Sequence, residues 1–207
     1  RQHLAEAYAK MPRIREIDMQ LRRTMAQAAQ AAFLQGTDGK ELLEQDLVEE
    51  ITRISSGNGP KPVYRVKGTN IAVYESPVGG PMTAGMLENV RAALGIKNIL
   101  AFGICGVLTE LEEGKCILPT DAYRDEGTSY HYCPASDYMH IKNCDKLAEL
   151  FDRLGVGYVK GKTWTTDAMY RETVGNRDLR VAEGCIAVDM ECAALQAVCD
   201  FRGMELY

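Results

Sequence analysis

The chain has 207 residues, 46% of them hydrophobic, which is enough for one domain with a packed core. Its formal net charge is −5 and its 24 Lys and Arg residues are scattered, so a nucleic-acid partner is not expected. No apolar run reaches the roughly 18–20 residues that cross a bilayer, and no charged-then-apolar leader opens the sequence. We therefore expect a cytoplasmic protein with no membrane partner.

The N-terminal part of the sequence predicts helices. Residues 4–35 are rich in Ala, Gln, Leu, Met and Arg and predict helices broken near Pro12, and a further helix is predicted from Lys40 to Ile54. A loop from Ser55 to Pro60 follows. We predict a helical segment over residues 1–59 and an α/β unit over residues 60–207, which together form one domain.

After residue 60, strands and helices alternate. The turn at 67–69 joins two short strands, and the apolar spacing over 82–94 predicts a helix that stops at Gly95. The strand, helix and strand over 70–104 form a crossover of the kind that builds parallel sheets, which gives an α/β fold class. The predicted strands are 63–66, 70–74, 99–102, 115–123, 157–166 and 187–190, and the other predicted helices are 145–154 and 191–201.

The cysteines and histidines predict neither a disulfide framework nor a metal site. The seven cysteines are odd in number and form no C-x-x-C pair, and the three histidines have no cysteine pair beside them. Cys185, Cys192 and Cys199 recur every seven residues, a spacing that predicts packing along one helix face.

Ligands of open parallel sheets bind at the carboxyl ends of the strands, so the strand-to-loop junctions are the candidate site. Glycines follow two predicted strands, at Gly79-Gly80 and at Gly103-Ile104-Cys105-Gly106. Their backbone N–H groups can hold an anion, and the alternative is a pair of tight turns.

The polar and aromatic segment 124–132 also follows a strand. Its His131 is a candidate general acid or substrate hydrogen-bond donor, and the alternative is a structural histidine bonded to the neighbouring carboxylates. The segment 163–172 contains Thr166 and Asp167, which can contact a polar ligand. In the same segment Met169 and Tyr170 can supply apolar surface for a flat ring, and the alternative is a turn capped by Asp167.

The run Asp189-Met190-Glu191 places two carboxylates at a buried strand end, where solvation is poor. An acidic residue at a helix start is also favoured by the helix dipole. An ionised carboxylate can accept hydrogen bonds from two adjacent hydroxyls, and the hydroxyls of a ribose suit this site.

Four ordered motifs resemble uridine and purine nucleoside phosphorylase-like proteins of the nucleoside phosphorylase superfamily. They are Gly103-x-Cys105-Gly106, Asp125-Glu126-Gly127-Thr128-Ser129, Thr166-Asp167-x-x-Tyr170 and Asp189-Met190-Glu191, and the likeness spans residues 60–207. The resemblance implies a three-layer fold with a mostly parallel, mixed central sheet flanked by helices. It also implies pentosyl transfer from a purine or pyrimidine base to phosphate without a cofactor, in a homodimer or hexamer.

By the same resemblance, Glu191 is the catalytic residue that holds the ribose hydroxyls, with Met190 and Asp189 beside it. Met169 matches a position where family members often place an aromatic ring against the base. No base-side acid is assigned, since family members continue beyond Tyr207 into a strand, a loop with an acidic residue and a helix. The family's N-terminal strand is also not evident, because residues 1–59 read as helical.

Two residues depart from the pattern of the phosphorylases. Ala101 stands where they carry a phosphate-binding arginine, and Ile104 stands where a hydroxyl residue is expected. Neither side chain can bind phosphate, and replacement by Arg124 or Arg171 is one hypothesis. A nucleosidase that uses water, or a non-catalytic nucleoside-binding protein, are therefore alternatives to a phosphorylase.

Overall fold

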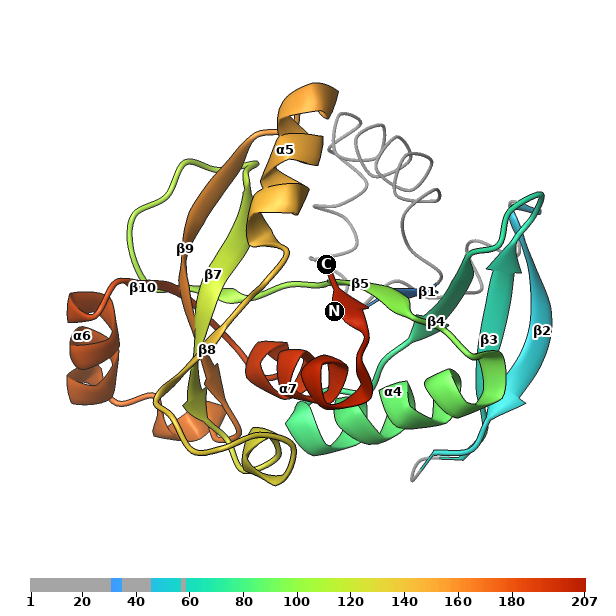
Figure 1. Cartoon of the computed structure of the whole chain (residues 1–207). Helices are drawn as coiled ribbons and strands as arrows, with labels where there is room; N and C mark the ends of the chain where they lie inside the picture. Colours follow the sequence, from blue (N-terminus) through green and yellow to red (C-terminus); the bar gives the residue numbers. More distant parts are fainter. Residues whose placement is uncertain (1–30, 35–45, 57–58) are drawn as a thin grey trace.

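The structure, a computed structural model, describes residues 31–34, 46–56 and 59–207. The strands form two hydrogen-bonded sheets, and helix α7 (Cys192–Arg202) packs against both of them (Figure 1). The prediction of an α/β fold with a mixed sheet flanked by helices is confirmed, and the strands are divided between two sheets.

The first sheet has the order β11-β5-β1-β4-β3-β2. Its four strands β11, β5, β1 and β4 run parallel, and β3 and β2 extend it as an antiparallel edge. The strands are β1 (Ala31–Leu34), β2 (Val48–Ile54), β3 (Lys61–Val66), β4 (Ala72–Glu75), β5 (Asn98–Phe102) and β11 (Glu205–Leu206).

The second sheet has the order β6-β10-β9-β7-β8. Its three central strands β10, β9 and β7 are parallel, so their carboxyl ends lie at one edge, where Asp189 pairs with Thr165 and Asp125 pairs with Thr166. The strands are β6 (Gly106–Val107), β7 (Cys116–Asp125), β8 (Tyr138–His140), β9 (Tyr158–Thr166) and β10 (Cys185–Asp189).

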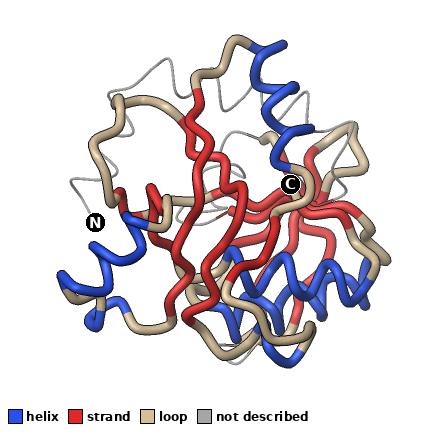
Figure 2. Tube along the Cα trace, turned by 60° about the vertical axis from the view of Figure 1, so that its left-hand side comes forward, coloured by secondary structure: helices blue, strands red, loops and turns tan. Residues whose placement is uncertain are grey.

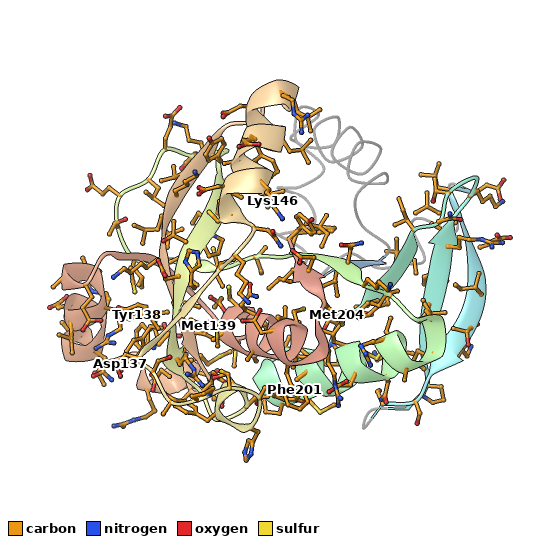
Figure 3. The ribbon with its side chains drawn as sticks, in the orientation of Figure 1. Asp137, Tyr138, Met139, Lys146, Phe201 and Met204 are labelled. Atoms are coloured by element: carbon orange, nitrogen blue, oxygen red, sulfur yellow. The ribbon has the colours of Figure 1, made fainter. Side chains whose placement is uncertain are left out.

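Helices α4 (Gly80–Leu94) and α7 lie side by side in both views (Figures 1 and 2). Residues from α4, α7 and the first sheet share one core cluster, while Ala193 and Ala197 of α7 pack against the second sheet, including Met139 of β8 (Figure 3). A helix that is apolar on several faces is typical of a buried position between layers, and the small alanines allow both sheets to approach it.

The remaining helical elements lie at the borders of the sheets. Helix α5 (Cys144–Leu154) begins beside the C-terminal end of the chain, where Asn143 Nδ2 donates to the Leu206 carbonyl at 2.8 Å (Figure 2). Helix α6 (Val174–Ala182) precedes β10, and two 3₁₀ turns, η1 (Ser129–His131) and η2 (Met169–Arg171), follow β7 and β9.

The helix predictions for the N-terminal part are wrong wherever the structure describes that part. Residues 48–54 form the edge strand β2 rather than the end of a helix, and residues 31–34 form β1 between β4 and β5. Pairing with neighbouring strands overrides the helical propensity of alanine, leucine and glutamate at these positions. The other predicted helices of residues 1–45 lie outside the described residues.

The seven-residue cysteine spacing does not follow one helix face. Cys185 lies in β10, whereas Cys192 and Cys199 lie in α7. Cys185 and Cys199 are fully buried, and desolvation raises the pKa of Cys199 to about 12. All seven cysteines are free thiols, and these three act as small packing residues.

Candidate active site

The junction between β10 and α7 carries the acidic run predicted from the sequence. Asp189 ends β10, and its Oδ1 accepts the backbone N–H groups of Glu191 and Cys192, both at 2.8 Å. The hydroxyl of Thr165 donates to the same oxygen at 3.1 Å, and the hydroxyl of Thr163 donates to Oδ2 at 2.6 Å. Asp189 therefore caps the first turn of α7, and both of its carboxylate oxygens are occupied.

Glu191 links this junction to the other sheet. Its side chain is buried, and its Oε1 accepts the backbone N–H of Gly79 at 2.7 Å. Its Oε2 lies 3.3 Å from the backbone N of Met190. The Glu191 carboxylate thus lies at the N-terminal end of α4, where the backbone N–H of Gly79 holds it in place.

Gly79 and Gly80 shape the N-terminal end of α4. Gly79 has φ 94° and ψ 145°, a conformation open essentially to glycine alone, and it places its N–H toward Glu191. A Cβ on Gly80 would lie 3.2 Å from Ala194 Cβ and 3.4 Å from Thr128 Oγ1. The glycine pair therefore allows α4 to approach α7 and the loop after β7. The Gly79 N–H, predicted to hold phosphate, already donates to Glu191.

The loop after β7 contains a second buried carboxylate. Glu126 accepts the Ser129 N–H at 2.9 Å and also accepts the Ser129 hydroxyl. The guanidinium of the buried Arg124 donates through Nε to that hydroxyl at 2.8 Å and through Nη1 to the Pro134 carbonyl at 2.8 Å, and it lies 4.0 Å from the Tyr130 ring centroid. These contacts hold Arg124 within its own loop, while its buried Nη2 has no hydrogen-bond partner among the described residues, and a phosphate-binding role for Arg124 stays a prediction.

The loops after β7 and β9 are joined by polar contacts. Asp125 Oδ2 accepts the Trp164 indole N–H at 2.9 Å and the Thr166 hydroxyl at 3.3 Å. Asp167 Oδ2 accepts the Gly127 N–H at 3.1 Å. The two strand ends therefore form one connected rim of the site. The turn that follows is capped by Thr166, whose hydroxyl accepts the Ala168 N–H at 3.2 Å, and not by Asp167, whose carboxylate bonds the loop after β7. A contact between the exposed Asp167 and a ligand stays a prediction.

Met169 and Tyr170 lie on η2, just beyond this rim. Met169 is 49% exposed and Tyr170 is 95% exposed, so both present apolar surface outward from the carboxyl end of β9. Such surface can contact a flat ring, and this role stays a prediction.

The glycine loop after β5 lies against the end of β10. Gly106 pairs with Val188, and a Cβ on Gly106 would lie 2.6 Å from Val188 Cγ1. Gly103, Ile104 and Cys105 are exposed. The loop therefore lies beside Val188, which precedes Met190 by two residues in the sequence.

Three groups of this edge have raised pKa values. Desolvation is the largest cause for Asp189, Cys105 and Cys192, and the negative charge of Asp189 raises the pKa of both thiols further. A thiol with a raised pKa is a poor nucleophile at neutral pH, so the arrangement does not favour covalent catalysis by either cysteine.

His131 is exposed at the end of η1, and its backbone N–H donates to the Thr128 carbonyl at 3.0 Å. Within the loop that the structure describes, the His131 side chain makes no hydrogen bond to the neighbouring carboxylates. The alternative of a structural histidine bonded to them is therefore wrong. The role of His131 as a general acid stays a prediction.

The structure brings together Glu191, Asp189, Gly79, Gly80 and the loop after β7. Sequence reasoning missed the side chains whose hydrogen bonds fix this arrangement, which are Glu126, Thr163 and Thr165. Thr163 and Thr165 could have been recognised from their alternation along one strand, since residues i and i+2 face the same side of a sheet.

Within the described ranges, no group of three His, Cys, Asp or Glu side chains is arranged to hold a metal ion. In the same part of the chain, no helix combines the length and the apolar character required to span a bilayer.

Comparison with known proteins identifies a family. The model of the phosphorylase superfamily matches residues 36–206. A guanosine phosphorylase of Halorubrum lacusprofundi is 25% identical over 182 residues, which are 84% of this chain and 73% of that protein. A DeoD-type purine nucleoside phosphorylase of Bacillus cereus is 26% identical over 133 residues, 62% of this chain, and the match spans only 57% of the relative's length.

Solved structures share the fold. A purine nucleoside phosphorylase of Toxoplasma gondii superimposes with a TM-score of 0.70 at 21% identity, covering 86% of this chain and 74% of that chain. The MTAN of Helicobacter pylori gives 0.66 at 17% identity, covering 85% and 84%. The futalosine hydrolase of Helicobacter pylori gives 0.66 at 18% identity, covering 87% and 82%.

Proposed function

The chain belongs to the phosphorylase superfamily, and on this premise we propose that it cleaves the N-glycosidic bond of a purine nucleoside and transfers the ribose to inorganic phosphate. Phosphorylases of the family use phosphate as a substrate and need no cofactor. The purine class is supported by the curated relatives, which are named guanosine and purine nucleoside phosphorylases. The observation that carries the proposal is the buried carboxylate of Glu191.

Glu191 suits a ribose ligand because its carboxylate is buried, ionisable and fixed. The Gly79 N–H holds Oε1 at 2.7 Å, and the hydroxyls of a ribose would donate to the same carboxylate, whose two oxygens can accept several hydrogen bonds. Met190, the partly buried neighbour of Glu191, would pack on the sugar face. Fixing the sugar in this way lowers the entropic barrier to reaction at its anomeric carbon.

In the proposed reaction, the bond between the anomeric carbon and the base nitrogen breaks, and its electron pair leaves with the base. A phosphate oxygen forms the new bond to the anomeric carbon, and the base gains a proton, for which His131 is the predicted donor. Positive charge develops on the sugar in between, and the nearby Glu191 carboxylate stabilises it.

The base would lie against the rim formed by the loops after β7 and β9. Met169 and Tyr170 supply exposed apolar surface there, and Thr166 and Asp167 supply polar groups. This surface matches the two needs of a purine, a flat apolar face and a hydrogen-bonding edge.

Hydrolysis is the second candidate, and the glycine loop after β5 favours it. Ile104 is 70% exposed on this loop and Ala101 precedes it, so neither side chain offers an anion a hydrogen bond. Backbone N–H groups at Gly80, Gly103, Cys105 and Gly106 are the proposed phosphate contacts, but they supply no formal positive charge. Water needs no such charge, so an apolar loop is compatible with a nucleosidase.

The test is release of free base from guanosine, inosine, adenosine and uridine, with and without inorganic phosphate. We expect release from purine nucleosides that requires phosphate. Release that is equal without phosphate establishes the nucleosidase instead, and release from uridine alone contradicts the purine assignment.

Glu191→Gln keeps the size of the side chain and removes its charge, so we expect it to lower kcat/KM by about 100-fold or more, as for loss of a group that stabilises developing charge. Glu112→Gln is the matched control, because Glu112 is exposed and forms an ion pair with Lys115 at 2.7 Å. Full activity of the Glu191 variant would refute the proposed ribose site.

A further inference from the structure

We propose that Asp189 is a positioning residue that fixes the orientation of Glu191, and that it is not a ribose ligand. The proposal rests on the proposed function of Glu191 and assigns Asp189 a role different from the one that the resemblance implied. It is carried by the four hydrogen bonds that the Asp189 carboxylate accepts from within the protein.

Donors of the protein already occupy the Asp189 carboxylate. Three donors converge on Oδ1 and Thr163 donates to Oδ2 at 2.6 Å. A ribose hydroxyl would have to compete with these donors, and any buried donor it displaced would lose its partner, which is unfavourable. The carboxylate therefore has little capacity left for a ligand.

These bonds hold the backbone at the start of α7. Two of the donors are the backbone N–H groups of Glu191 and Cys192, so the Asp189 carboxylate fixes the peptide from which the Glu191 side chain projects. Thr165 extends this hold, because its hydroxyl donates to Asp189 at 3.1 Å and accepts the Ala193 N–H at 3.1 Å. The first turn of α7 is thus tied to both β10 and β9.

Glu191 is held at both its backbone and its carboxylate. Its backbone is held by Asp189, and its carboxylate is held by the Gly79 N–H at 2.7 Å. A side chain held at both ends keeps a single orientation, which is the condition for a preorganised site. Loss of the Asp189 contacts frees one of these two ends.

The experiment compares two substitutions at this position in the full chain. Asp189→Ala removes every contact, and we expect kcat/KM to fall by about 100-fold, as for a small misplacement of a reacting group. Asp189→Asn keeps an oxygen for both amides, and we expect it to stay within roughly fivefold of the wild type, because Asn and Asp cap helices about equally well.

The matched control is Asp200→Ala on the same helix. Asp200 accepts the Gln196 amide at 2.8 Å and pairs with Lys142 at 2.7 Å, at the end of α7 that is remote from Glu191. We expect it to leave kcat/KM unchanged. Asp189→Ala is also combined with Glu191→Gln. A residue that acts through Glu191 adds no further loss in that background, whereas a general structural defect adds its full loss.

Two outcomes overturn the proposal. One is a loss for Asp189→Asn that equals that of Asp189→Ala on a ribonucleoside and disappears on a 2′- or 3′-deoxynucleoside, since the carboxylate would then touch the ribose. The other is unchanged amide hydrogen exchange over residues 190–194 in Asp189→Ala, where we expect faster exchange. The exchange measurement needs no substrate, so it tests the positioning role even if the wild-type protein releases no base.

Discussion

Gly79→Ala should destabilise the protein and disturb Glu191 without any steric clash. A Cβ at this position meets no atom within 4 Å, so the effect comes from the backbone alone. At φ 94° and ψ 145°, a residue with a Cβ is strained by about 1–3 kcal/mol. The peptide can relieve this strain only by rotating, and rotation moves its N–H away from Glu191 Oε1, which loses a charge-assisted bond of about 1.5–3 kcal/mol.

Backbone strain and loss of the hydrogen bond to Glu191 have similar magnitudes, so we expect the free energy of unfolding to fall by about 1–3 kcal/mol. For a chain of this size, each kcal/mol lowers Tm by roughly 2–4 °C. Urea denaturation followed by circular dichroism measures the change, and base release reports on Glu191.

Gly85→Ala is a control of opposite sign in the same helix. Gly85 is exposed in the interior of α4, has ordinary helical φ, and a Cβ there meets no atom within 4 Å. Alanine should therefore stabilise the helix by about 0.5–1 kcal/mol. If Gly79→Ala is as stable as the wild type, or if both variants shift in the same direction, the backbone argument for Gly79 is refuted.

Gly106→Ala should destabilise the protein by about 1–3 kcal/mol through overpacking, because the new Cβ would lie 2.6 Å from Val188 Cγ1. Combining it with Val188→Ala should recover part of that loss in a urea-denaturation cycle, and purely additive effects would contradict the clash. Trp164→Phe removes the 2.9 Å bond to Asp125 and should lower the free energy of unfolding by about 1.5–3 kcal/mol, whereas an unchanged denaturation midpoint would show that this bond contributes nothing. The native pKa of Asp189 is raised, so the native state binds its proton more tightly than the unfolded chain does. Its contribution to stability is full below the unfolded pKa of about 3.9 and is lost as pH rises through the native pKa; Asp189→Asn should remove this falling component from denaturation curves measured from pH 4 upward, and an identical slope would contradict it.

The sequence predicted three helices and most of the longer strands after residue 60 because their signals are local, but it did not predict α6, β6, β8 or β11. The apolar spacing over 82–94 and the stop at Gly95 correspond to α4, whose C-cap Gly95 adopts φ 66°. The acidic run at 189–191 was recognisable because charged residues directly follow a buried strand. These features depend on neighbours in sequence, and propensity and pattern report on them directly.

The failures depend on partners far away in sequence. The strand β1 owes its conformation to β4 and β5, which lie some 40 to 70 residues further along the chain. Likewise the bonds from Thr163 and Thr165 to Asp189 follow from the register of β9 against β10, which no local pattern specifies. The sequence therefore indicated Asp189 and Glu191 as candidate site residues but not Thr163 and Thr165, whose hydroxyls hold Asp189.

The geometry of the candidate site depends on the contact between the two sheets. Glu191 projects from the end of β10 in the second sheet, and the N–H that holds its carboxylate belongs to Gly79, which follows β4 of the first sheet. The spacing between these elements is set by α4 against α7, where a Cβ placed on Gly80 would lie only 3.2 Å from Ala194 Cβ. Any change that separates the two helices also lengthens the bond from Gly79 to Glu191. Packing in the core and orientation of the Glu191 carboxylate are therefore coupled in this protein, so a substitution that shifts α4 against α7 also shifts Glu191.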